Sequence, residues 1–121
     1  MTAALAAALR AAAAGVPPDE AGTSLLIDSG HFLHRADFTP FIRAAAAVSD
    51  GTPMAWTDWD ALTAALDTGQ LPSSSGEKAV LRLAASLAAG TPVSLRDTVT
   101  SLDHANLNRA VTAIRRAAGH P

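Results

Sequence analysis

The sequence predicts an all-α fold, a compact bundle of six to seven short helices in a single domain over residues 1–121, with one short extended segment near residues 54–57. Large apolar side chains recur at every third or fourth position, which places them on one face of a helix. Capping residues, glycines and prolines divide the chain into short segments, and no linker is long enough to separate two domains. Alanine, the strongest helix former, supplies about a quarter of the 121 residues.

The first segment is expected to form two helices. Residues 3–14 form the first helix, which ends at Gly15 and has few large apolar side chains, so we expect a loosely docked arm. Residues 18–29 form the second, because Pro18 suits a first helical turn and acidic residues follow it. A short strand over residues 25–27 is the alternative.

The middle of the chain is expected to alternate between turns and one helix. Residues 30–37 form a turn, and Asp37 caps a third helix. Residues 48–53 form a loop that leads into the extended piece at residues 54–57. The buried stripe of the third helix is expected to be Phe38, Phe41, Ile42 and Ala45.

Two further helices have clear amino-terminal signals. The fourth is capped by Thr57 or Asp58, and the fifth begins with a capping box in which Ser74 and Glu77 satisfy each other's backbone donors. These helices are expected to end at Gly69 and Gly90. Their apolar stripes are Trp59, Leu62 and Leu66 in the fourth helix and Val80, Leu83, Ala84 and Leu87 in the fifth.

The last two helices also have amino-terminal capping signals, the first of which resembles a capping box. Ser94 and Asp97 open a short sixth helix, and Asp103 caps a seventh helix over residues 104–118. The apolar residues expected to point inward from the seventh helix are Leu107, Val111, Ile114 and Ala118.

Composition and charge exclude several classes of function. The chain has no cysteine, which excludes disulfides, thiolate zinc sites and cysteine nucleophiles, and no tyrosine. The formal net charge of −2 gives no general attraction to nucleic acid or to anionic membranes. We expect a cytoplasmic protein that is not an enzyme, binds no cofactor or metal, and does not associate with membranes.

Four potential metal ligands recur at every third position from the end of the second predicted helix through the predicted turn. They are Asp28, His31, His34 and Asp37. Helical spacing would rotate successive members of this series away from one another, so all four cannot converge on one ion. We therefore interpret the segment as a polar turn.

The stretch over residues 73–103 resembles the region from the signature motif to the D-loop of ABC-type and chromosome-maintenance ATPases. The resemblance is carried by SGEK at residues 75–78 and TSLD at residues 100–103. Such a site would offer helix N–H groups to a phosphate. The chain has no G-x-x-x-x-G-K-S/T loop and no strand ending in Asp-Glu before the second motif, so we interpret the stretch as two capped helices.

A broader resemblance covers most of the chain. The runs LLIDSGH at residues 25–31, WTDW at residues 56–59 and LD at residues 102–103 resemble small proteins of high-GC, actinobacterial-type bacteria. No activity is attached to that group, so the resemblance assigns no functional residue.

The sequence favours a non-enzymatic protein-interaction or regulatory module. Residues 1–70 carry three basic and eight acidic side chains and residues 71–121 carry six and three, so we expect a protein partner or self-association as a homodimer. The alternative is a helix-turn-helix-like protein that binds DNA with its last helix. The expected binding face in both cases is Asn108, Arg109, Thr112, Arg115 and Arg116.

Overall fold

The computed structural model describes residues 2–120 and is mostly helical, but it is not all-α. About 60% of the chain is helical, and a small antiparallel hairpin accompanies the helices. The α-helices are α1 (Thr2–Ala13), α2 (Pro17–Asp28), α3 (Trp59–Thr68), α4 (Ser75–Ala89), α5 (Leu95–Val99) and α6 (His104–Ala117). The hairpin consists of β1 (Ile42–Ala46) and β2 (Pro53–Thr57), and a 3-10 turn over Thr39–Phe41 precedes it.

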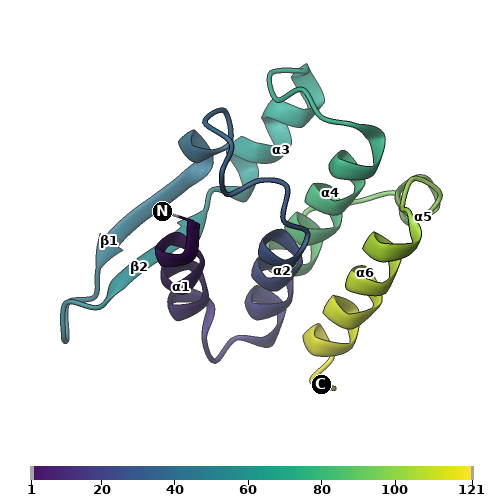
Figure 1. The fold of residues 1–121 in the computed structure, drawn as a ribbon. Coiled ribbons are helices and arrows are strands. Elements are labelled where there is room, and N and C mark those ends of the chain that lie inside the picture. The colour runs from purple at the N-terminus through teal and green to yellow at the C-terminus, as the bar shows by residue number, and fades with distance from the viewer. Residues whose placement is uncertain (1, 121) are drawn as a thin grey trace.

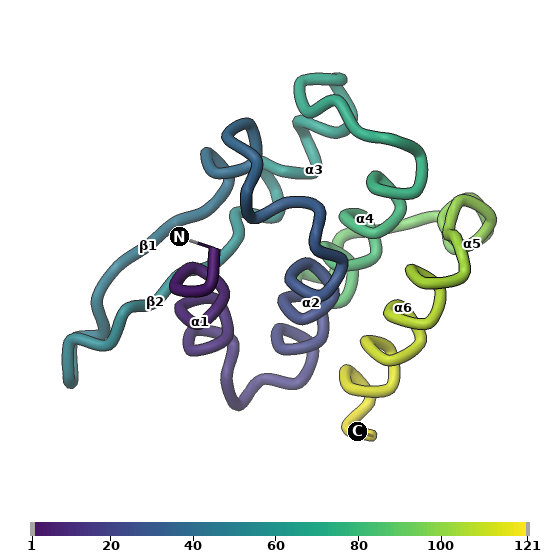
Figure 2. Tube along the Cα trace, in the orientation of Figure 1, coloured from purple at the N-terminus to yellow at the C-terminus, as the bar shows by residue number. Residues whose placement is uncertain are grey.

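Helix α2 lies at the centre of the arrangement. It packs against α4 and α6, while α1 lies between α2 and the hairpin (Figure 1). The Cα trace shows the same order from the hairpin across to α6, with the amino-terminal end beside the hairpin and the carboxyl-terminal end at α6 (Figure 2). Helix α1 is therefore a packed element, and its Leu9 is buried against Ala55 of β2.

The close approach of α2 to α4 depends on Gly22. A Cβ added there would lie 2.5 Å from the carbonyl oxygen of Ala84 and 2.7 Å from the Cβ of Ala88, both on α4. Ala21 and Ala84 belong to the main core cluster, whose fully buried side chains include Leu25, Leu26, Phe32, Phe38, Val80 and Leu81.

The predicted third helix is wrong. Asp37 does not cap a helix, because its carboxylate pairs with Arg35 at 2.7 Å, and the chain enters β1 at Ile42. Two tertiary constraints overrule the helical spacing. The ring of Phe38 packs on that of Phe32 with centroids 5.4 Å apart, and β1 pairs along its whole length with β2.

Several local predictions are confirmed. The second predicted helix, over residues 18–29, is found as α2, which ends one residue earlier at Asp28 with Ser29 as its C-cap. The extended segment at residues 54–57 belongs to β2. The Asp58 side chain accepts a hydrogen bond from the Ala61 N–H and so caps α3. The reciprocal box of Ser74 and Glu77 opens α4. The remaining predicted caps and terminating glycines are Ser94, Asp103, Gly69 and Gly90.

We expect Gly22→Ala to lower the free energy of unfolding by about 1–3 kcal/mol, because the new Cβ meets backbone that cannot move aside. Urea denaturation measures this change. Gly76→Ala is the matched helical control, since its Cβ would meet only the Ser101 carbonyl oxygen at 3.3 Å. An increase in stability for Gly22→Ala, as at an exposed helical glycine, would contradict the close crossing.

The capping box predicts a pH dependence. The Ser74 N–H that donates to Glu77 lowers the pKa of that carboxyl below its usual value of 4.5. The carboxylate therefore stabilises the fold above the usual pKa, and this contribution is lost as pH falls through the lower folded-state pKa. Glu77→Gln retains a box-forming side chain but does not titrate. The urea midpoint of unfolding is measured at neutral pH and at about pH 3. Its decrease between these two pH values should be larger for the wild type than for Glu77→Gln.

Candidate functional site

The last helix packs on the rest of the protein through its small side chains. Asn106, Ala110 and Ala113 of α6 are buried, and Ala117 is partly buried beside them. These positions form one face that lies against α2. Because alanine has only a methyl group, this face lets the two helices approach closely.

The large aliphatic residues of α6 are consequently exposed. Leu107, Val111 and Ile114 expose 42%, 48% and 47% of their surface, and Ala118 is exposed as well. The prediction that these four residues point inward is therefore wrong. The alanines of α6 and its larger aliphatic residues each recur with helical spacing, so each set forms a stripe along one face. The structure buries the face with the smaller side chains. We call the exposed residues Leu107, Val111 and Ile114 the aliphatic stripe.

The inward face of α6 also contains one polar residue. Asn106 is buried, and its N–H donates to the carboxylate of Asp103 at 2.7 Å. Its side-chain oxygen accepts a hydrogen bond from Arg109 at 3.0 Å. A buried amide needs such partners, so this satisfied asparagine is compatible with the inward face.

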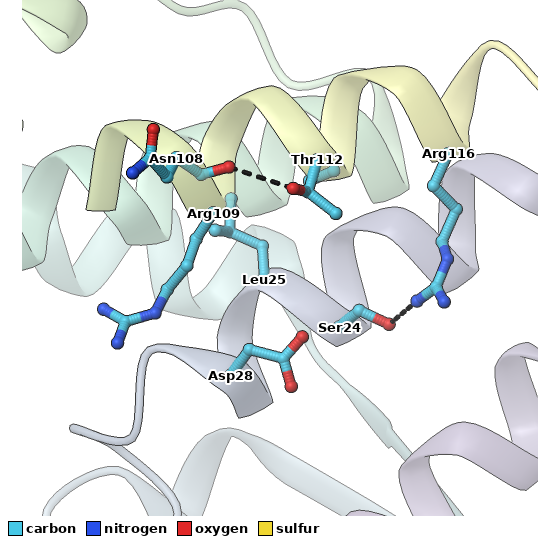
Figure 3. A pocket seen from close by; sticks show the side chains of 8 residues that line it. Ser24, Leu25, Asp28, Asn108, Arg109, Thr112 and Arg116 are labelled. Atoms are coloured by element: carbon cyan, nitrogen blue, oxygen red, sulfur yellow. Dashed lines mark hydrogen bonds between the residues drawn. The ribbon is translucent and has the colours of Figure 1, made fainter. Parts of the chain in front are cut away.

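The structure divides the five predicted site residues between two sides of α6. Arg115 lies away from α2 and does not line the neighbouring groove. The other four line a groove of about 270 Å³ between α6 and α2, together with Ser24 and Asp28. Figure 3 shows Arg109 and Arg116 reaching from α6 toward α2, with Asp28 between them along the groove. The four residues are Asn108, Arg109, Thr112 and Arg116.

Sequence reasoning missed the α1 and α2 residues of this region. The guanidinium of Arg10 donates to the Ser24 hydroxyl at 3.0 Å and pairs with Asp28 at 3.1 Å. Arg116 donates to the same hydroxyl from the opposite side of α2. The spacing of Ser24 and Asp28, one helical turn apart, is the only sequence signal for their proximity, and nothing in the sequence connects Arg10 with Arg116.

The arginines differ in their partners. Ion pairs with carboxylates hold Arg10, Arg35, Arg43 and Arg82. Within residues 2–120, the arginines of α5 and α6 pair with no carboxylate. These residues are Arg96, Arg109, Arg115 and Arg116. Helix α6 itself contains no acidic residue, so its surface charge is positive.

The other singled-out residues have structural roles. Asp28 and Asp37 are ion-paired with arginines, and the part of the chain described here contains no group of three or more His, Cys, Asp or Glu side chains placed to hold a metal. In the ATPase-like stretch, Glu77 accepts the Ser74 N–H and the Ser94 hydroxyl accepts the Asp97 N–H.

No protein-family model, curated protein or solved structure matches this chain. Across residues 2–120, no helix has the length and apolar character needed to cross a bilayer. The geometry of α6 and its neighbours is therefore what indicates a function for this chain.

The orientation of α6 can be tested with a pair of substitutions. We expect Ala110→Leu to lower the free energy of unfolding by about 1–3 kcal/mol, because the added atoms enter a packed helix interface. Leu107→Ala should change it by less than about 1 kcal/mol, because that residue is already 42% exposed and leaves no closed cavity when it is truncated. Urea denaturation distinguishes the two. The reverse order of effects would restore the inward orientation predicted from the sequence.

Proposed function

We propose that this protein is a non-enzymatic protein-interaction module that binds its partner on the aliphatic stripe of α6. The single observation that carries the proposal is the exposure of Leu107, Val111 and Ile114 on one well-formed helix. Isolated exposed aliphatic residues are ordinary, but three in register along a helix form a continuous apolar strip. Leu95 and Val99 of α5 are also exposed, at the amino-terminal end of α6 (Figure 1).

The spacing of the stripe suits a helical partner. Positions 107, 111, 114 and 118 are separated by four, three and four residues, which is the seam spacing of two helices packed side by side. A partner helix with its own apolar stripe would bury this surface, as in the helix-in-groove mode of recognition.

Charge favours an acidic partner over a second copy of this chain. Arg115 stands beside the stripe, pairs with no carboxylate among residues 2–120, and belongs to a helix that contains no acidic residue. Two copies of α6 packed together would bring positive charges toward each other. A partner helix with glutamate or aspartate flanking its apolar residues would pair with them instead, and complementary charge would also speed association.

The DNA-binding alternative has less support. A recognition helix presents polar side chains to the base edges, whereas the exposed surface of α6 contains three large aliphatic residues. Arg109 and Arg116, two of the arginines proposed for DNA contact, reach toward α2.

The experiment uses a synthetic amphipathic helical peptide with a leucine stripe flanked by glutamates, and measures its binding by fluorescence anisotropy. We expect saturable binding that weakens with added salt. Val111→Asn should weaken it about tenfold, because an aliphatic contact is lost. Thr112→Asn introduces the same side chain one position away, outside the stripe, and should leave the affinity unchanged.

Four results would overturn the proposal. The first is no binding of the glutamate-flanked peptide at millimolar concentration, and the second is equal binding of a lysine-flanked peptide. The third is a dimer in analytical ultracentrifugation that Val111→Asn dissociates, which would make a second copy the occupant. The fourth is sedimentation with vesicles of anionic lipid that depends on Val111, which would make a membrane surface the target.

A further inference from the structure

Two guanidinium groups meet at one buried hydroxyl on the other side of α6. Ser24 is 6% exposed, and its oxygen accepts hydrogen bonds from Arg10 of α1 and Arg116 of α6. The two cationic groups are therefore within about 6 Å of each other, since each is a hydrogen-bond length from the same atom. Like charges this close repel unless an anion lies nearby. Asp28 pairs with Arg10 at 3.1 Å, which leaves Arg116 as the guanidinium of the two without a carboxylate among residues 2–120.

The hydroxyl proton of Ser24 has no acceptor among residues 2–120. A serine hydroxyl has two lone pairs and one O–H donor, and here the arginines occupy both lone pairs. Other helical hydroxyls in this protein, such as those of Ser29, Thr63 and Thr112, donate to a carbonyl about one turn earlier. Ser24 makes no such bond, so its donor is available beside the two guanidinium groups.

The groups that meet at Ser24 are therefore mainly donors, and the ligand that suits them is an acceptor with negative charge. Arg116 has no carboxylate partner among the described residues, and Arg109 reaches into the same groove. A guanidinium binds a carboxylate through two parallel hydrogen bonds.

The charge of the lining favours a ligand with one negative charge. The groove of about 270 Å³ and an adjoining cavity of about 320 Å³ share Ser24 and Arg116. Their charged lining residues are Arg10, Arg109, Arg116, Glu20 and Asp28, which leaves one net positive charge. A carboxylate balances this charge, whereas a phosphate dianion would exceed it. Leu25 and Ala113 supply an apolar wall for a short carbon chain.

We propose that Arg10, Ser24 and Arg116 form a binding site for a small carboxylate with a short apolar chain. One carboxylate oxygen would accept the Ser24 O–H, and the free donors of Arg116 would bind the carboxylate beside it. The site is on the side of α6 that faces α2, and it shares no residue with the aliphatic stripe.

The test uses butyrate as the probe and its neutral analogue butyramide as the control, followed by NMR through the amide of Ser24 and the Nε–H of Arg116. We expect saturable shifts with butyrate and none with butyramide. Inorganic phosphate is a third arm and should bind more weakly than butyrate. Arg116→Gln should raise the Kd for butyrate about tenfold, while Arg115→Gln, a neighbouring exposed arginine outside the groove, should leave it unchanged.

Three results would overturn the proposal: equal shifts with butyramide, tighter binding of phosphate, or an unchanged Kd in Arg116→Gln. Ser24→Ala tests the hydroxyl separately and should also weaken butyrate binding. If Ser24→Ala does not fold, Arg116→Gln alone decides, because its side chain lies at the surface. The acidic peptide and Val111→Asn measure the aliphatic stripe alone, so either proposal can fail without the other.

Discussion

The packing of α2 between α4 and α6 is the constraint on which the other features of the molecule depend. On one side, Gly22 allows the backbone of α2 to approach Ala84 and Ala88 more closely than any side chain would permit. On the other side, Ala110 and Ala113 bring α6 close to the same helix. Small residues at both crossings fix the distance and rotation of the neighbouring helices. The rotation of α6 then determines which of its residues reach solvent and which reach α2.

This rotation leaves burial energy unused. Fully burying a leucine, valine or isoleucine side chain contributes about 1.5–3 kcal/mol, and the three residues of the aliphatic stripe are each nearly half exposed. The close α2–α6 contact favours the observed face within the single chain. Asn106 can lie on that face because residues of its own helix and cap satisfy its hydrogen bonds. A partner helix that covered the stripe would gain the burial energy that the isolated fold does not use. The exposed stripe therefore has a physical explanation in packing and a consequence for binding.

Features set by neighbouring residues were predictable from the sequence, and features set by distant residues were not. The caps at Asp58, Ser74 and Asp103 depend on hydrogen bonds within one turn, so their residue types indicated them. The strand β1 depends on pairing with β2 and on the contact of Phe38 with Phe32, neither of which helical spacing reveals. The sequence predicts helix α6 but not which of its faces is buried. Its alanines and its larger aliphatic residues form two stripes of the same periodicity, and spacing alone does not distinguish them. For the same reason the sequence predicts one face for the five site residues, whereas the structure separates Arg115 from the other four.

The two surfaces of α6 belong to one rigid element, and this has a thermodynamic consequence. Arg116 connects α6 to α2 through Ser24, while Val111 lies on the side of α6 that a partner helix would cover. A carboxylate that binds the Ser24 O–H and the free donors of Arg116 together would strengthen one of the contacts that set the position of α6. If partner binding requires that position, the two ligands must affect each other's affinity by the same factor, because coupling between two sites is reciprocal. If α6 is held by its alanine face alone, the two sites bind independently. The small-residue interface with α2 thus decides whether this protein has two separate surfaces or one regulated surface.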